Sequence, residues 1–220
     1  MSRIISVVPA ILTDDPQALK TMVRQAETFC SYVQFDIMDG RFVPSQSIKC
    51  EHIAALNTTL SWEVHLMVEN PEDYVTDFLK AGARRITFHY EASSSPQKVI
   101  NLVKTLGLEA GLALNPETPV SAVLPLVSEV ASILFLSVHP GFYGSPFIPE
   151  VLQKVAELRN IYPEIEIGVD GGIKESNIAQ VAQAGADAIC VGSAIFLKPQ
   201  PAESYRHLSA LATEGLNQSP

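Results

Sequence analysis

The chain has 220 residues, of which 47% are hydrophobic, and this is enough for one sizeable core in a single domain. The formal net charge is −9 without a long basic run. This argues against nucleic acid or an anionic membrane as a partner, although backbone N–H groups could still bind a phosphate locally. Three scattered cysteines, no signal-peptide pattern in Met1–Val8 and no apolar run of membrane-spanning length predict a soluble protein in a reducing, cytoplasmic setting.

Short β-rich runs alternate with helix-like stretches along the whole chain. The expected strands are Ile4–Val8, Tyr32–Ile37, Leu60–Leu66, Arg84–His89, Glu109–Ala113, Ser132–Val138, Ile165–Val169 and Ala188–Val191. The expected helices are Pro16–Phe29, Ile48–Leu56, Pro71–Lys80, Pro96–Leu106, Val120–Val127, Pro149–Ile161, Glu175–Ala184 and Pro201–Leu211. Several strands are nearly all apolar, which is typical of strands that are covered on both faces.

Eight strands, each followed by a helix, predict a (β/α)₈ TIM barrel, an α/β fold that takes up residues 1–220 as one domain. Glycines at expected helix ends support this alternation, because they favour C-terminal capping. A doubly wound open sheet is the second choice, but no GxGxxG follows the first strand. Residues 213–220 are expected to be a frayed tail.

The segment QFDIMDG ends the second expected strand. Because side chains alternate along a strand, Phe35 and Ile37 should pack against helices. Gln34, Asp36 and Met38 then face the barrel interior near its C-terminal mouth. A carboxylate placed there is costly unless it is paired or bound to a metal ion. Asp36 is therefore a candidate for chemistry, and the alternative is an aspartate that caps the next loop.

The segment VHLMV ends the third expected strand and places His65 and Met67 on one face. A lone histidine in a strand is often a core residue, but Asp36 at the end of the preceding strand favours a ligand role for His65. Met67 is expected to pack in the core or against substrate. His89 ends the fourth strand and could support the site by donating a hydrogen bond.

Glycines follow three of the later strands. Asp170, Gly171 and Gly172 come after the seventh strand, where the glycines allow close approach to a ligand and expose N–H groups. Gly192 and Ser193 end the eighth strand, and the loops after these two strands often bind phosphate together. The alternative is that the Asp-Gly pair makes a plain turn.

The segment HPGFYGSPF follows the sixth strand. Gly141 and Gly144 make a bendable loop that is rich in N–H donors. Phe142, Tyr143 and Phe147 could close over a ligand. A rigid Pro-Gly surface turn is the alternative.

Strands two and seven stand three steps apart around an eight-stranded ring, so Asp36 and Asp170 should approach a bound molecule from roughly opposite sides. One acid can remove a proton from one face of a carbon while the other returns a proton to the opposite face. This inverts a carbon next to a carbonyl through an enediolate. A divalent metal held by Asp36, His65 and Asp170 would stabilise its charge as a Lewis acid.

These residues stand in a series of motifs that resembles ribulose-phosphate 3-epimerases along nearly the whole chain. In order, the motifs are PAIL, FDIMDGRFVP, VHLMVENPEDY, LALNPETP, SVHPGFYG, FIPEVL, VDGGI and VGSAIF. Their combination is highly specific. The resemblance implies a (β/α)₈ barrel that epimerises C3 between D-ribulose 5-phosphate and D-xylulose 5-phosphate.

The resemblance also implies roles for individual residues. Asp36 and Asp170 match the catalytic acid/base pair, and together with His65 they match ligands of a divalent metal such as Zn, Fe, Mn or Co. Met38 and Met67 match residues packed near the enediolate. The contacts with substrate and phosphate correspond to His65, Gly141, Phe142, Tyr143, Gly144, Asp170, Gly171, Gly172, Gly192 and Ser193.

The chain departs from the family pattern within the site. Gln34 stands where the family usually has a fourth, histidine ligand, and because an amide oxygen is a weaker ligand, zinc affinity should fall. The site could then bind another divalent metal or none. Ala10 replaces a usual serine, Leu136 a common methionine and Tyr143 a common glycine.

Three functions remain open from the sequence. The first is the ribulose-phosphate 3-epimerase, with an altered or absent metal and a small phosphorylated ketose as its partner. The second is the same chemistry on a hexulose 6-phosphate such as allulose 6-phosphate, because Ala10 and Tyr143 reshape the pocket. The third is a sugar-phosphate-binding barrel without catalysis, which Gln34 motivates. The full motif set argues against a lyase of the hexulose-phosphate synthase kind, and many barrels self-associate, so a homo-oligomer is also an option.

Overall fold

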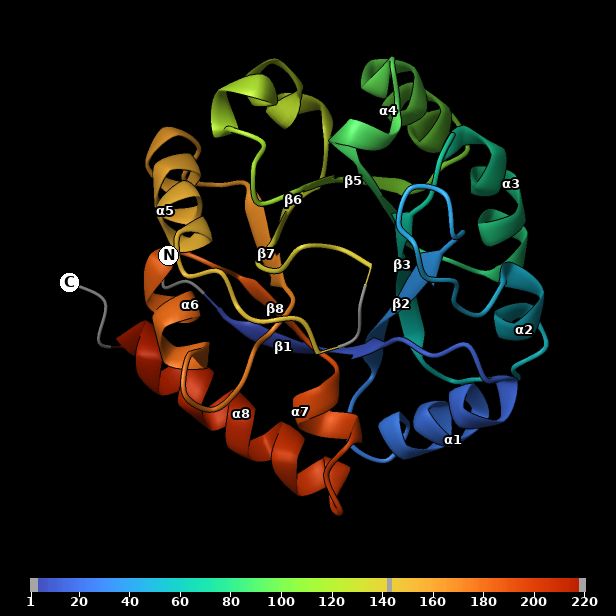
Figure 1. Cartoon of the computed structure of the whole chain (residues 1–220), viewed down its shortest axis with the longest axis vertical. Helices are drawn as coiled ribbons and strands as arrows, with labels where there is room; N and C mark the ends of the chain where they lie inside the picture. The colour runs from blue at the N-terminus through green and yellow to red at the C-terminus, as the bar shows by residue number, and fades with distance from the viewer. Residues whose placement is uncertain (1–3, 142–143, 218–220) are drawn as a thin grey trace.

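The computed structural model describes residues 4–141 and 144–217, and these residues form a closed barrel of eight parallel strands (Figure 1). Each strand pairs with its neighbours in chain order, and β8 closes the ring on β1. The strands are β1 (Ser6–Ile11), β2 (Tyr32–Met38), β3 (Ser61–Met67), β4 (Arg85–His89), β5 (Glu109–Leu114), β6 (Ser132–Leu136), β7 (Glu166–Asp170) and β8 (Ala188–Val191). The (β/α)₈ prediction is confirmed, and the open sheet is excluded because the ring has no edge.

Helices surround the ring on the outside (Figure 1). They are α1 (Pro16–Ala26), α2 (Cys50–Ala54), α3 (Glu72–Ala81), α4 (Pro96–Thr105), α5 (Val151–Ile161), α6 (Ile178–Ala184), α7 (Ser193–Phe196) and α8 (Pro201–Asn217), with 3₁₀ turns η1 (Tyr90–Ala92), η2 (Val120–Ala122) and η3 (Leu124–Glu129). No helix within residues 4–141 and 144–217 combines the length and apolar character that crossing a membrane requires.

The layer between strands and helices is apolar and closely packed. Phe35 of β2 is fully buried and meets Trp62 of β3 edge to face, with 5.3 Å between ring centroids. Trp62 in turn meets Phe78 of α3 edge to face, with 6.5 Å between ring centroids. Burial of aromatic area on this scale is a main source of barrel stability. The alternation predicted for β2 is therefore confirmed, since Phe35 points outward to the helices.

Several element boundaries differ from those predicted. Strand β1 continues beyond Val8, and Pro9, which has no N–H, lies where its pairing passes from β8 to β2. Strand β6 ends at Leu136, because Ser137 turns its backbone N–H and its hydroxyl to the carbonyl of Asp170. The expected helix at Val120–Val127 consists of two 3₁₀ turns, since Pro125 cannot continue an α-helix.

The expected frayed tail is wrong as far as Asn217, because helix α8 continues to that residue. Gly215 lets this part of α8 pack closely against α6. It lies so close to α6 that a Cβ atom there would be 2.6 Å from the carbonyl oxygen of Ala179. Residues 218–220 lie outside the described part of the chain.

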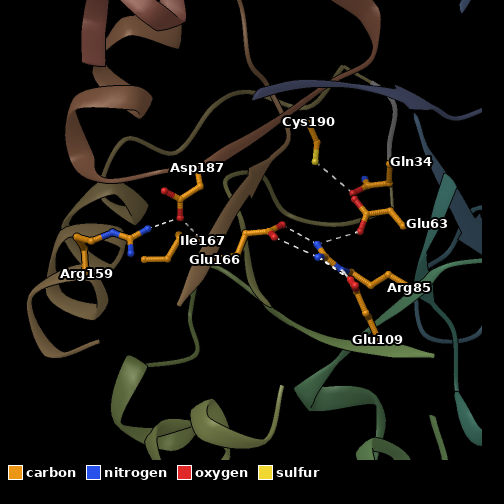
Figure 2. Close-up of polar contacts among 9 residues, drawn as sticks. All are labelled: Gln34, Glu63, Arg85, Glu109, Arg159, Glu166, Ile167, Asp187 and Cys190. Atoms are coloured by element: carbon orange, nitrogen blue, oxygen red, sulfur yellow. Dashed lines mark hydrogen bonds and ion pairs between the residues drawn. The ribbon is translucent and has the colours of Figure 1, made fainter. Parts of the chain in front are cut away.

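The amino-terminal end of the barrel interior is polar. Arg85 of β4 binds Glu166 at 2.6 Å and Glu109 at 2.8 Å, and its guanidinium lies 3.5 Å from Glu63 (Figure 2). A neighbouring ion pair joins Arg159 to Asp187. This network lies at the barrel end opposite to the loops that carry the predicted site residues.

Candidate active site

A cavity of about 310 Å³ opens at the carboxyl ends of the strands. The predicted site residues that line it are Asp36, Met38, Met67, Gly141, Gly144, Asp170, Gly171, Gly172, Gly192 and Ser193. They come from strands and loops that are far apart in the sequence and that barrel closure brings together. Phe142 and Tyr143 lie outside the described residues. His65 lies behind the carboxylates, with its side chain fully buried.

Asp36 and Asp170 face each other across two shared hydrogen-bond donors. The Nε2 group of Gln34 donates to Asp36 Oδ1 and to Asp170 Oδ2, at 2.8 Å in each case. The Nδ1 atom of His65 lies 3.2 Å and 3.3 Å from the same two oxygens. Two carboxylates repel each other when both are ionised, so this double bridge makes their close approach tolerable.

The charges of the site shift the pKa values of its members. Burial, together with the charge of Asp170, raises the pKa of Asp36 to about 6. Burial alone would lower the pKa of His65, but its hydrogen bonds to Asp170 and Asp36 raise it to about 9. At neutral pH His65 therefore carries a proton on each ring nitrogen. The pKa of Asp36 is close enough to neutral pH for this carboxyl group to accept and release a proton.

A second histidine supports His65 from β4. The Nε2 atoms of His65 and His89 lie 2.9 Å apart, and His89 Nδ1 lies 3.3 Å from Glu91. Burial lowers the pKa of His89 to about 4, so His89 is neutral, accepts a hydrogen bond from His65 and donates one to Glu91. The expectation that His89 supports the site is confirmed in position, although His89 accepts from His65 rather than donating to it.

The site contains a group of residues that could hold a metal ion. One oxygen each of Asp36 and Asp170 and one nitrogen of His65 lie within 4.8 Å of one another, and all three residues are buried. Carboxylate and imidazole donors suit a divalent ion. Gln34 does not complete the set as a fourth ligand in this structure, because its oxygen Oε1 points to Cys190 and accepts a hydrogen bond from the thiol at 3.1 Å.

The glycines after β7 need to be glycines for two reasons. Gly171 and Gly172 have positive φ angles of 103° and 67°, which side chains disfavour. A Cβ on Gly172 would lie 2.9 Å from the backbone of Phe147, and one on Gly171 would lie 2.5 Å from Val138. The backbone of this loop is thus packed tightly against the loop after β6, with both glycines on the cavity wall.

The sequence did not point to several residues of the cavity wall. Lys174 follows the two glycines, and its exposed side chain borders the cavity. Cys190 of β8 lies on the cavity wall, and burial raises the pKa of its thiol. Lys174 could have been predicted from the sequence, because a cation two residues after a double glycine is well placed to bind an anion. Nothing in the local sequence distinguishes Cys190. The substituted positions Ala10 and Leu136 also line the cavity.

Comparisons with known proteins agree with this geometry. Residues 6–196 match the ribulose-phosphate 3 epimerase family. The cytoplasmic isoform of ribulose-phosphate 3-epimerase from Oryza sativa subsp. japonica is 41% identical over 204 residues, which cover 90% of each chain. Ribulose-phosphate 3-epimerase from Synechocystis sp. is 41% identical over 213 residues and 93% of each chain.

A solved structure of 3-hexulose-6-phosphate synthase from Salmonella typhimurium has a TM-score of 0.72 over 96% of this chain and 100% of that one. Its sequence identity of 16% makes it evidence of a shared barrel fold alone. The matches in sequence run along most of the chain, from β1 to α7, and include every strand that contributes to the site. The chain therefore belongs to the ribulose-phosphate 3 epimerase family.

Proposed function

We propose that Asp36 and Asp170 are the acid/base pair with which this epimerase inverts C3 of D-ribulose 5-phosphate to give D-xylulose 5-phosphate. The observation that carries the assignment is the pair of facing carboxylates on the wall of a cavity of about 310 Å³. The substrate follows from the names of the relatives that share 41% of their residues with this chain.

One carboxylate removes the C3 proton, and the other delivers a proton to the opposite face of the planar enediolate. The pKa of about 6 at Asp36 suits this exchange, because a group that titrates near neutral pH can both accept and release a proton. Protonated His65 holds both carboxylates in place and offsets their negative charge. A divalent metal held by Asp36, His65 and Asp170 would take the place of the proton on His65 Nδ1, and it would supply Lewis-acid stabilisation of negative charge at the reacting oxygens.

The phosphate group would bind over the loops after β7 and β8, which begin directly after Asp170 and Val191. Gly171 and Gly172 bring backbone close to the cavity, and Gly192 and Ser193 begin the short helix α7. Backbone N–H groups at such positions favour an anion. Met38 and Met67 pack together as apolar walls beside the aspartates, where they would exclude water from the enediolate.

Deuterium exchange at C3 tests the assignment. The protein is incubated with D-ribulose 5-phosphate in D₂O and followed by NMR, with chelator or with added Zn²⁺, Mn²⁺, Fe²⁺ or Co²⁺. We expect deuterium at C3 and the appearance of xylulose 5-phosphate. Asp36→Asn and Asp170→Asn should each lower turnover by about 10²- to 10⁴-fold, the usual contribution of a general acid or base.

The matched control is Asp77→Asn, which changes an exposed aspartate on α3 and should leave turnover unchanged. Turnover in either active-site variant at the level of this control would contradict the roles of the two aspartates. Absence of exchange in the unchanged protein, with every metal tried, would contradict the substrate, and six-carbon ketose phosphates would then be tested in the same assay.

A further inference from the structure

The amide of Gln34 is held in a single orientation by three partners. Its nitrogen donates to Asp36 and Asp170 at 2.8 Å each, and its oxygen accepts from the thiol of Cys190 at 3.1 Å. Figure 2 shows Cys190 reaching from β8 to the amide oxygen on β2. Gln34 is 1% exposed and Cys190 is 2% exposed, so bulk water does not compete for these groups.

The chemistry of the partners decides which end of the amide faces the aspartates. Ionised carboxylates accept hydrogen bonds and cannot donate them, whereas a thiol can donate. If the amide were reversed, its oxygen would face two carboxylate oxygens and its NH₂ group would face the sulfur. That arrangement loses two charge-assisted hydrogen bonds and places like partial charges together.

The bridge occupies the lone pairs that a cation would need. The two oxygens that accept from Gln34 are the oxygens within 4.8 Å of His65 Nδ1 in the Asp36–His65–Asp170 group. A metal ion bonded to both would lie about 2 Å from each oxygen, next to the positively polarised amide hydrogens. An ion bonded to these two oxygens therefore requires Gln34 to leave both of them, and Cys190 opposes the rotation that would turn the amide oxygen toward the ion.

We propose that Gln34, oriented by Cys190, bridges the two aspartates in place of a metal ion, so that the acid/base pair is positioned without a metal and metal affinity is low. Gln34 and Cys190 are positioning residues in this arrangement, since they act on the substrate through Asp36 and Asp170. The catalytic half of this inference rests on the proposed function, and the metal-affinity half does not.

Calorimetric titration of the chelator-treated protein with Zn²⁺ and with Mn²⁺ tests the affinity. Gln34→His places an imidazole, a common metal ligand, where the amide donor stands. We expect this variant to bind at least tenfold more tightly than the unchanged protein. The unchanged protein should keep its C3-proton exchange after chelator treatment. Tight binding of one equivalent of either metal by the unchanged protein, with loss of exchange on chelation, would overturn the proposal.

The role of Cys190 is separated from a packing role by two substitutions. Cys190→Ala removes the donor that orients the amide, so Gln34 can turn its oxygen toward an ion and metal affinity should rise several-fold. Cys190→Ser keeps a donor at this position and should return the affinity to that of the unchanged protein. A purely structural defect would lower the affinity or leave it unchanged, which would overturn the orienting role.

Cys30→Ala is the control for loss of a cysteine, because the half-buried Cys30 bonds the carbonyl of Ala26 away from the cavity. It should change neither metal affinity nor exchange. If none of the proteins exchanges the C3 proton, the proposed function fails. The order of metal affinities among Gln34→His, Cys190→Ala and Cys190→Ser then supports or overturns the bridge by itself.

Discussion

At the scale of single residues, the cavity rim carries a cation that suits a phosphorylated substrate. The side chain of Lys174 is exposed and borders the cavity beside Gly171 and Gly172. The chain as a whole has a net charge of −9, so a local positive charge matters for attracting an anion. The position of Lys174 next to the expected phosphate loop predicts a role in binding rather than in proton transfer.

Lys174→Ala should raise KM for ribulose 5-phosphate by roughly two- to tenfold and leave kcat nearly unchanged, since exposed charge pairs contribute little energy. Steady-state kinetics at low and high salt measure this, and the effect should shrink as salt screens the charge. Lys20→Ala, an exposed lysine on α1, is the control. A fall in kcat with no change in KM would place Lys174 in the chemistry instead.

A side chain at Gly172 would incur two costs, backbone strain from the positive φ and a clash with Phe147, and a second glycine allows them to be measured separately. Gly172→Ala should destabilise the fold by about 2–4 kcal/mol, because it adds backbone strain and a clash with Phe147. Gly107 has a φ of 80° with open space around it, so Gly107→Ala should cost only the strain, about 1–2 kcal/mol. Urea unfolding measures both, and equal losses would show that the contact with Phe147 contributes nothing.

At the scale of elements, the alternation of side chains along strands could be predicted from the sequence. The alternation of apolar strands with helices predicted the barrel. The alternation of side chains along β2 predicted that Gln34, Asp36 and Met38 point into its interior. The orientation of Gln34 could not be predicted, because it depends on Cys190, which lies 156 positions away in the chain. Long-range partners of this kind follow from barrel closure rather than from any local pattern.

The polar network around Arg85 could not be predicted from local sequence patterns either. Its members stand at the beginnings of separate strands, where a charged residue ordinarily faces solvent. The helix ends shifted for a similar reason. Helix α8 extends past the predicted end, and its extension packs closely against α6 at Gly215.

Gly215 in α8 gives a test of that packing. An alanine in a helix interior is favoured over glycine by about 1 kcal/mol. At this position the added Cβ would lie 2.6 Å from the carbonyl oxygen of Ala179, so Gly215→Ala should instead lower stability by about 1–3 kcal/mol. Thermal and urea unfolding measure the change, with the exposed neighbour Glu214→Ala as control. A gain in stability would mean that α8 moves away from α6 at little cost.

At the scale of the whole molecule, the barrel separates chemistry from stability along its axis. The cavity and the aspartates lie at the carboxyl ends of the strands. Arg85 and the carboxylates that it binds, drawn in Figure 2, lie at the opposite end. Changes at the Arg85 end should therefore alter stability more than turnover. Self-association and a cytoplasmic location stay predictions.

The Arg85 end predicts a specific dependence of stability on pH. Burial raises the pKa of Glu63 from 4.5 to about 7, although Arg85 favours the charged form. Between these two pH values the folded protein keeps a proton on Glu63 that the unfolded chain has released. The folded state then binds more protons, so the contribution of Glu63 to the free energy of unfolding falls as pH rises through this window.

Glu63→Gln removes this titration, so the stability of the variant relative to the unchanged protein should increase from pH 4.5 to pH 7 and level off above. The change should be roughly 1–3 kcal/mol, on top of an offset that does not vary with pH. Urea unfolding of both proteins across this range measures it. Glu109→Gln, which removes a more exposed partner of Arg85, controls for the lost ion pair. A difference between Glu63→Gln and the unchanged protein that stays constant with pH would show that Glu63 is ionised in the fold throughout, with Arg85 fully offsetting its burial.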